Sequence, residues 1–230
     1  MSAIEAVFFD LGETLVNEGE IYGRWADWLR VPRHTFNAVL GGAIARGDSY
    51  LAVFEHFRPG FDLAAEERAR AEAGVPNLWG ADDLYPDARG CLAALKAQGL
   101  HVGVAGNQPK EVTELVAGLG LAADVIGISD NWGVQKPDLA FFARVTEEAS
   151  RGLGRPIGPD RILYVGDRVD NDVRPALAFG MPIAFLRRGP WGHVQSHDAA
   201  DVLPRCLFRL DDLDELPALI AAHNAPYALR

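Results

Sequence analysis

The chain has 230 residues, of which 49% are hydrophobic and 23% are charged, a composition typical of a soluble globular protein with a substantial core. Its formal net charge of -10, without any basic run, argues against binding to nucleic acid or to an acidic membrane surface. No apolar run approaches membrane-spanning length, and a strand pattern starts too near the N-terminus to leave room for a signal peptide, so we expect a cytoplasmic protein.

The first predicted element is a strand over residues 6–9, a short run of apolar side chains with the sequence AVFF. Such a run is typical of a central strand that is buried on both faces. It stops abruptly at Asp10, and Gly12, Glu13 and Thr14 follow in a turn. Asp10 would therefore lie at the carboxyl end of a buried strand, which is where parallel sheets bind ligands.

A helical block follows the first strand, and no strand pattern interrupts it before about residue 85. Its last element, residues 62–73, is rich in Ala, Glu and Arg, with Asp62 as the expected N-cap and Gly74 after its end. Three apolar stripes at helical spacing precede it, so the block is predicted to contain about four helices. The stripes are Ile21/Trp25/Trp28/Leu29, Phe36/Val39/Leu40/Ile44 and Tyr50/Leu51/Phe54/Phe57.

From residue 86 onward, strand and helix patterns alternate, which predicts an α/β fold with a doubly wound parallel sheet. This Rossmann-like core would consist of residues 1–16 and 86–230. The block 17–85 would be an inserted α-helical cap over the carboxyl edge of the sheet. The expected strands are 101–105, 124–128, 161–165, 182–186 and 207–210, and the expected helices are 86–98, 109–118, 138–151, 172–179 and 213–223.

Several charged residues far from Asp10 in the sequence are also expected at the carboxyl edge of the sheet. The strand over residues 161–165 ends in Gly166-Asp167, with Asp172 close behind, and Lys136 lies in the segment Gln-Lys-Pro-Asp. Because the carboxyl ends of parallel strands meet at one edge, these carboxylates and the lysine would come together there. Such a group of charges can bind a divalent metal and a phosphate at once.

Three segments, Asp10 to Thr14, Lys136-Pro137 and Gly166-Asp167 with Asp172, resemble motifs one, three and four of the haloacid dehalogenase superfamily. They occur in the expected order, each at its expected strand end. The resemblance covers the predicted core, and the insert is similar to that family's helical cap in position and length. It implies a capped, phosphatase-like hydrolase that acts on a small phosphorylated metabolite.

By that resemblance, Asp10 is the nucleophile, and its carboxylate forms an aspartyl-phosphate that water then hydrolyses. Mg²⁺ would be held by Asp10, the main-chain carbonyl of Gly12 and Asp167, while Asp172 would orient its water ligands. Lys136 would neutralise the phosphate, and we expect Arg168 to attract the anion at the mouth of the site. The chemistry needs these cations because a carboxylate and a phosphate dianion repel each other.

The sequence departs from the family pattern at two positions. Gly12 stands where phosphatases usually carry a second Asp that protonates the leaving group. The absence of this acid should lower the rate by about 10²–10⁴. Gly106 stands where a Ser or Thr usually donates a hydrogen bond to the phosphoryl group. Glu13 is either a replacement acid or a turn residue that points away, and Asn107 is a candidate donor to the phosphate. We therefore expect a weakened phosphatase, or one restricted to good leaving groups.

Two alternatives stay open on the sequence alone. The first is a catalytically degenerate module on the same fold that binds a metal, a phosphate or a protein, as Gly12 and Gly106 suggest. The second is a carbon–halogen hydrolase, because dehalogenases also lack the second Asp, although the retained acids would disfavour a carboxylate substrate. The identity of the substrate also stays open. An exposed aromatic cap face would favour a homodimer without requiring one.

Overall fold

The computed structural model describes residues 2–75 and 79–227, which fold into two compact units. The first unit consists of Met1–Val16 and Leu84–Arg230, and the second consists of Asn17–Asp83. The second boundary falls at Leu84 rather than at residue 86, because Val16 and Leu84 form an antiparallel bridge. This bridge joins the two crossings of the chain between the units.

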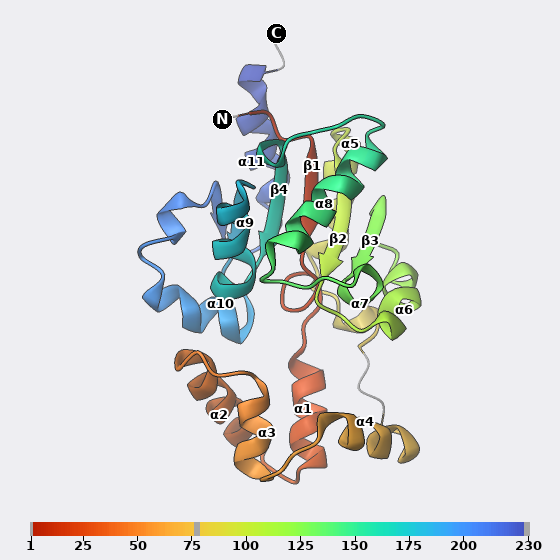
Figure 1. The fold of residues 1–230 in the computed structure, drawn as a ribbon, viewed down its shortest axis with the longest axis vertical. Helices are drawn as coiled ribbons and strands as arrows, with labels where there is room; N and C mark the ends of the chain where they lie inside the picture. The colour runs from red at the N-terminus through yellow and green to blue at the C-terminus, as the bar shows by residue number, and fades with distance from the viewer. Residues whose placement is uncertain (1, 76–78, 228–230) are drawn as a thin grey trace. The chain divides into compact units, whose positions relative to one another are not determined.

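The first unit is built on a parallel sheet, which has six strands in the described part of the chain and the order β3-β2-β1-β4-β5-β6 (Figure 1). The predicted α/β fold with a doubly wound parallel sheet is therefore confirmed. The chain reverses its direction of travel across the sheet beside β1, and ligands bind at such a switch point. The strands are β1 Ala6–Phe9, β2 His101–Gly106, β3 Val125–Ile128, β4 Ile162–Gly166, β5 Ile183–Leu186 and β6 Phe208–Leu210.

Helices cover both faces of this sheet (Figure 1). The α-helices of the unit are α5 Ala88–Ala97, α6 Thr113–Gly118, α7 Ser129–Trp132, α8 Leu139–Gly152, α9 Arg174–Phe179, α10 Gly189–Gln195 and α11 Leu216–Asn224. Short 3₁₀ turns occupy Lys110–Val112, Pro159–Arg161, Ser196–Asp198, Leu203–Arg205 and Ala225–Tyr227, and a π-helical turn occupies Val169–Val173. On the face covered by α8 and α9, Phe8 and Tyr164 from the sheet pack with Phe141 and Phe142 from α8.

The helix pattern differs from the prediction in four places. Helices α7 and α10 were not predicted, because four residues are too few to show a period and α10 carries two glycines and a proline. The helix expected over residues 109–118 begins as a 3₁₀ turn, so α6 starts only at Thr113. The helix expected over residues 172–179 is preceded by the π-helical turn at Val169–Val173, a rare element that is frequent at functional sites.

The second unit contains the predicted helices, in the part that the structure describes. They are α1 Gly19–Trp28, α2 Arg33–Ala45, α3 Leu51–Phe57 and α4 Leu63–Glu72, with a 3₁₀ turn at Ala81–Asp83. Asp62 caps α4 as expected, since its side chain accepts a hydrogen bond from the N–H of Ala65. The aromatic rings of Trp25 and Phe36 each pack edge-on against Phe54 in the centre of the unit.

Within the described residues, none of the helices combines the length and the apolar character that crossing a bilayer requires.

Candidate active site

A buried lysine joins two carboxylates at the carboxyl edge of the sheet. The Nζ atom of Lys136 lies 2.6 Å from Oδ1 of Asp10 and 2.6 Å from Oδ1 of Asp172. Lys136 is 3% exposed and Asp172 is fully buried. Burial by itself would lower the pKa of Lys136, but Asp10 and Asp172 raise it well above its ordinary value. The lysine is therefore a permanent cation beside Asp10.

Asp167 completes an acidic cluster with Asp10 and Asp172, and one carboxylate oxygen from each of the three lies within 4.8 Å of the other two. Asp167 is 1% exposed, and neither of its carboxylate oxygens has a hydrogen-bond partner among the described residues. Burial, with the charges of Asp172 and Asp10, raises the pKa of Asp167 well above its ordinary value. A buried carboxylate without a partner is costly unless a cation neutralises it. This cluster therefore has the donor set and the charge that suit Mg²⁺.

The π-helical turn after β4 brings Asp172 into this cluster. Its carboxylate oxygen Oδ2 accepts a hydrogen bond of 2.9 Å from the N–H of Arg168, at the start of the turn. Burial raises the pKa of Asp172 to about 6, while Lys136 opposes that shift. Gly166 makes the approach possible, because a Cβ atom there would lie 2.4 Å from Cγ of Asp172.

The variant Gly166→Ala is expected to displace Asp172 and to weaken binding of a divalent cation by about 10–100-fold, as losses around metal ligands commonly do. Overpacking should also lower the free energy of unfolding by about 1–3 kcal/mol. Titration calorimetry with Mg²⁺ and a melting curve measure the two effects. Gly90→Ala is the matched control, because a Cβ atom at Gly90 meets nothing within 4 Å. A Gly166→Ala protein with the wild-type affinity for Mg²⁺ would contradict this account of the turn.

Gly106, at the end of β2, lies directly against the carboxylate of Asp10. A Cβ atom at Gly106 would come within 2.7 Å of Oδ1 of Asp10 and 3.5 Å of Leu11. The other departure from the family pattern, Gly12, lies two residues after Asp10 in the turn and pairs with Val16. A side chain at position 106 would require Asp10 to turn away from its present orientation.

The side-chain amide of Asn107 engages the main chain of Lys136. Its Nδ2 donates to the carbonyl oxygen of Lys136 at 2.8 Å, and its Oδ1 accepts from the N–H of Lys136 at 2.8 Å. The sequence analysis placed Asn107 as a donor to phosphate. In the structure, the same side chain holds the lysine that neighbours Asp10.

Glu13 is buried, at 5% exposure, and its Oε2 atom accepts a hydrogen bond of 2.6 Å from the hydroxyl of Tyr85. Its φ angle is +52°, and Gly189 makes room for its side chain, because a Cβ atom there would lie 2.6 Å from Cγ of Glu13. Burial and the bond to Glu13 raise the pKa of Tyr85. The guanidinium of Arg188 lies 4.1 Å from the centre of the Tyr85 ring. Glu13 therefore belongs to a polar network beside the turn.

Arg168 has a carboxylate partner on its own loop. Its side chain donates to Asp170 at 3.1 and 2.7 Å, and the guanidinium lies 5.1 Å from the centre of the Trp191 ring. Asp170 is an exposed ion-pair partner and lies outside the acidic cluster. The contact of Arg168 with the cluster is made by its main-chain N–H.

Tyr164 and Tyr85 are site neighbours that the sequence analysis did not identify. The hydroxyl of Tyr164 donates to the carbonyl oxygen of Ala105 at 2.7 Å, and Nζ of Lys136 lies 5.3 Å from the centre of its ring. In the sequence, Tyr164 is one member of an apolar strand, so only its burial pattern was readable. Tyr85 lies in the first unit, directly after the chain returns to it at Leu84, where the sequence shows no motif.

Comparison with protein families matches residues 4–180 to the model described as haloacid dehalogenase-like hydrolase. The matched range contains all the residues of the acidic cluster and Lys136. The chain is also similar to the glyceraldehyde 3-phosphate phosphatase of Methanopyrus kandleri, with 33% identity over 121 residues, or 51% of this chain and 49% of that protein. The phosphoglycolate phosphatase of Rhodospirillum rubrum is 35% identical over 119 residues, or 50% of this chain and 46% of that protein.

The chain spans about half the length of the curated relatives that it matches. Among solved structures, the β-phosphoglucomutase of Clostridium difficile superposes with a TM-score of 0.63 at 17% identity, covering 99% of this chain and 100% of that chain. At this identity the superposition shows a shared fold, and it does not show a shared reaction.

Proposed function

Since the chain belongs to the haloacid dehalogenase-like hydrolase family, we propose that it is a Mg²⁺-dependent phosphatase of small phosphorylated metabolites, with Asp10 as its nucleophile. The names of the matching relatives, which are phosphatases of three-carbon and two-carbon phosphates, favour this substrate class. From the family resemblance, we further propose that the unit Asn17–Asp83 takes part in substrate selection. A cytoplasmic location remains part of the proposal.

One observation carries the proposal: a permanent cation and a carboxylate without a partner flank Asp10 together. Lys136 bonds Asp10 at 2.6 Å, and the buried Asp167 belongs to the same cluster. Nucleophilic attack of a carboxylate on a phosphate dianion requires positive charge on both sides of the reacting atoms. Lys136 supplies one such charge, and the acidic cluster has the composition to bind the other.

In this mechanism the Asp10 carboxylate attacks phosphorus, the leaving oxygen departs, and water then cleaves the resulting acyl phosphate at phosphorus to regenerate Asp10. Lys136 screens the repulsion between Asp10 and the phosphate and holds Asp172 in place. Mg²⁺, held by Asp10 and Asp167 with Asp172 beside it and the main-chain carbonyl of Gly12 as a further ligand, would supply Lewis-acid stabilisation of charge on the phosphoryl oxygens.

The weak point of this site is proton donation to the leaving group, because Gly12 has no side chain to donate. Glu13 is the nearest acid in sequence, but its carboxylate accepts a hydrogen bond from Tyr85. We therefore propose that the enzyme favours leaving groups that need little protonation, such as acyl phosphates and aryl phosphates. Acyl and aryl phosphates are accordingly the substrates to assay first, before the panel of phosphorylated metabolites.

The variant Glu13→Gln tests whether Glu13 supplies the missing proton. If it does, turnover of alkyl phosphates should fall by about 10²–10⁴, and turnover of aryl phosphates should change little. Tyr85→Phe is the matched variant, because it removes the hydrogen bond to Glu13 and keeps the carboxylate. Steady-state rates on a paired alkyl and aryl series measure the effect. An equal loss on both series, or no loss, would exclude Glu13 as the acid.

The proposed function itself is tested by a panel of phosphorylated metabolites with Mg²⁺ present. Release of inorganic phosphate from two-carbon and three-carbon phosphates, at rates above those of sugar and nucleoside monophosphates, would support the substrate class. A preference for nucleotides would overturn the substrate class. Release of halide from 2-haloacids without release of phosphate would overturn the reaction type.

A further inference from the structure

The loop after β2 and the segment that carries Lys136 are joined by two reciprocal pairs of hydrogen bonds. In the first pair, the amide of Asn107 both donates to and accepts from the main chain of Lys136, each at 2.8 Å. Because one planar side chain satisfies both polar groups of a single residue, it fixes the position and the orientation of that peptide segment.

The second pair anchors the other end of the segment. The hydroxyl of Ser129 accepts from the N–H of Gln108 at 3.1 Å and donates to the carbonyl oxygen of Gln108 at 3.2 Å. Ser129 is 6% exposed and begins α7. Consecutive residues of one loop, Asn107 and Gln108, therefore hold both ends of the stretch from Ser129 to Lys136.

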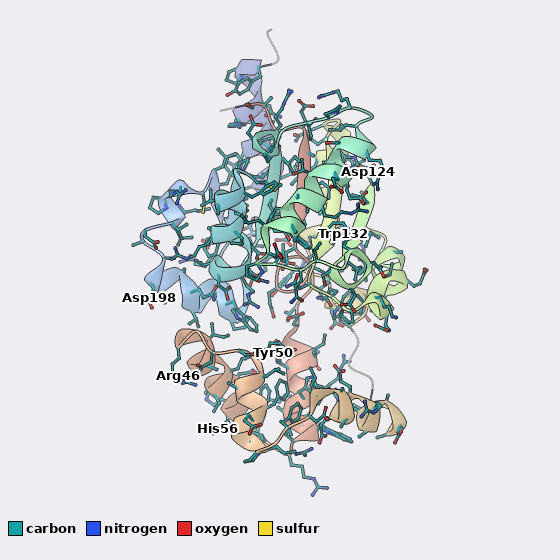
Figure 2. The ribbon with its side chains drawn as sticks, viewed as in Figure 1. Arg46, Tyr50, His56, Asp124, Trp132 and Asp198 are labelled. Carbon is teal, nitrogen blue, oxygen red and sulfur yellow. The ribbon has the colours of Figure 1, made fainter. Side chains whose placement is uncertain are left out.

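Packing stiffens the stretch between these anchors. The ring of Trp132, labelled in Figure 2, lies against Gly127, where a Cβ atom would be 2.0 Å from the ring. The same ring lies 5.4 Å from the ring of Phe141, centre to centre. Asp138 then caps α8 by accepting from the N–H of Ala140 at 2.9 Å. The backbone on both sides of Lys136 is thus fixed by neighbours.

A fixed backbone matters here because a lysine side chain is long and flexible and bonds as a point charge. Its Nζ atom lies 2.6 Å from carboxylate oxygens of both Asp10 and Asp172. A shift of about 1 Å in a group that positions reacting atoms can cost about 100-fold in rate. Gly106 provides no hydroxyl beside Asp10, whereas Nζ of Lys136 bonds its carboxylate directly, so the position of the lysine bears on the orientation of Asp10.

We propose that Asn107 is a positioning residue, which acts on the reaction through Lys136. Ser129 helps by holding the other end of the stretch from Ser129 to Lys136. The inference rests on the proposed function only where its test measures turnover. It replaces the expectation that Asn107 donates to the phosphate.

The first test is a double-mutant cycle on the turnover of p-nitrophenyl phosphate. Asn107→Ala should lower kcat by about 10–100-fold, since the lysine is displaced by up to about 1 Å. In a Lys136→Ala background the same change should have little further effect, because Asn107 acts through the lysine. Asn131→Ala is the control, since it removes a hydrogen bond of 2.9 Å to Thr113 in the same region. Full additivity in the cycle would overturn the proposal.

The second test does not depend on activity. The chain has three lysines, Lys96, Lys110 and Lys136, so acetylation by acetic anhydride can be followed at each by peptide mass spectrometry. In Asn107→Ala, the labelling rate of Lys136 relative to Lys110 should rise several-fold, with the melting temperature close to that of the wild type. Ser129→Ala should show a smaller rise, and it serves if Asn107→Ala does not fold.

The outcomes separate the two claims. An unchanged labelling rate of Lys136 in both folded variants would overturn the positioning role, whatever the activity. A wild-type protein that releases no phosphate would overturn the proposed function, and the labelling rates would then decide the positioning role alone.

Discussion

Asp10→Asn is expected to abolish the hydrolysis of phosphate monoesters, with a loss on the order of 10⁴-fold or more, because it removes the proposed nucleophile. The amide is nearly the same size as the carboxylate, so the turn after β1 should keep its shape. Lys136 would retain its bond to Asp172. The fold should therefore survive, and the loss should appear in kcat.

The matched control for this change is Asp170→Asn. Asp170 is also an acid of the Gly166–Asp172 segment, but it is exposed and pairs with Arg168 outside the cluster. Its replacement should leave kcat within about threefold of the wild type, as is usual for surface substitutions. Turnover by Asp10→Asn close to that of Asp170→Asn would exclude Asp10 as the nucleophile.

Asp167→Asn has the second largest expected effect, because it acts on metal binding and on stability in opposite directions. The neutral amide should remove most of the affinity for Mg²⁺ and with it the turnover. In metal-free protein, the same change removes a buried charge without a partner, so the melting temperature should rise. For a chain of this size, each kcal/mol corresponds to about 2–4 °C.

The pH dependence of stability gives this prediction a second readout. The pKa of Asp167 is raised in the folded state, so the folded chain holds this proton more tightly than the unfolded chain does. Metal-free wild type should therefore lose stability as the pH rises from the ordinary carboxyl range up to that raised pKa. The loss from this residue should be absent in Asp167→Asn and should be offset by Mg²⁺ in the wild type. Melting curves across that pH range, with and without Mg²⁺, measure both effects.

A result against this account would be an Asp167→Asn protein that is less stable than the wild type without metal, or one that Mg²⁺ still stabilises equally. Either would mean that Asp167 has another role in the fold. Asp138→Ala is a suitable comparison, because the carboxylate of Asp138 caps α8 and its removal should show the ordinary cost of a lost cap, about 0.5–2 kcal/mol.

The sheet could be predicted because most of its strands are short apolar runs, and because β1, β2 and β4 each stop at a glycine or an acid. Asp10 and Asp167 lie at adjacent strand ends in the structure, since β1 pairs with β4. Lys136 could be placed with them only through the motif order, because it lies on a loop. The helices that were not predicted, α7 and α10, are short and carry no apolar period.

The hydrogen-bond partners of the site could not be predicted in the same way. The bonds from Asn107 to Lys136 and from Tyr85 to Glu13 join residues 29 and 72 positions apart. Such partners depend on the directions of side chains in the folded protein, which the order and spacing of residue types along the sequence do not show. The ion pair between Arg168 and Asp170 is local, yet two charges two residues apart are equally consistent with separate solvated side chains.

Trapping the covalent intermediate tests the central claim most directly. Wild-type protein would be mixed with acetyl phosphate that carries the radiolabel on phosphorus and quenched rapidly, with and without Mg²⁺. The labelled peptide would then be mapped. The account predicts a Mg²⁺-dependent acyl phosphate on the peptide that contains Asp10, and no label in Asp10→Asn. Phosphate release without label on Asp10, or label on another residue, would contradict it.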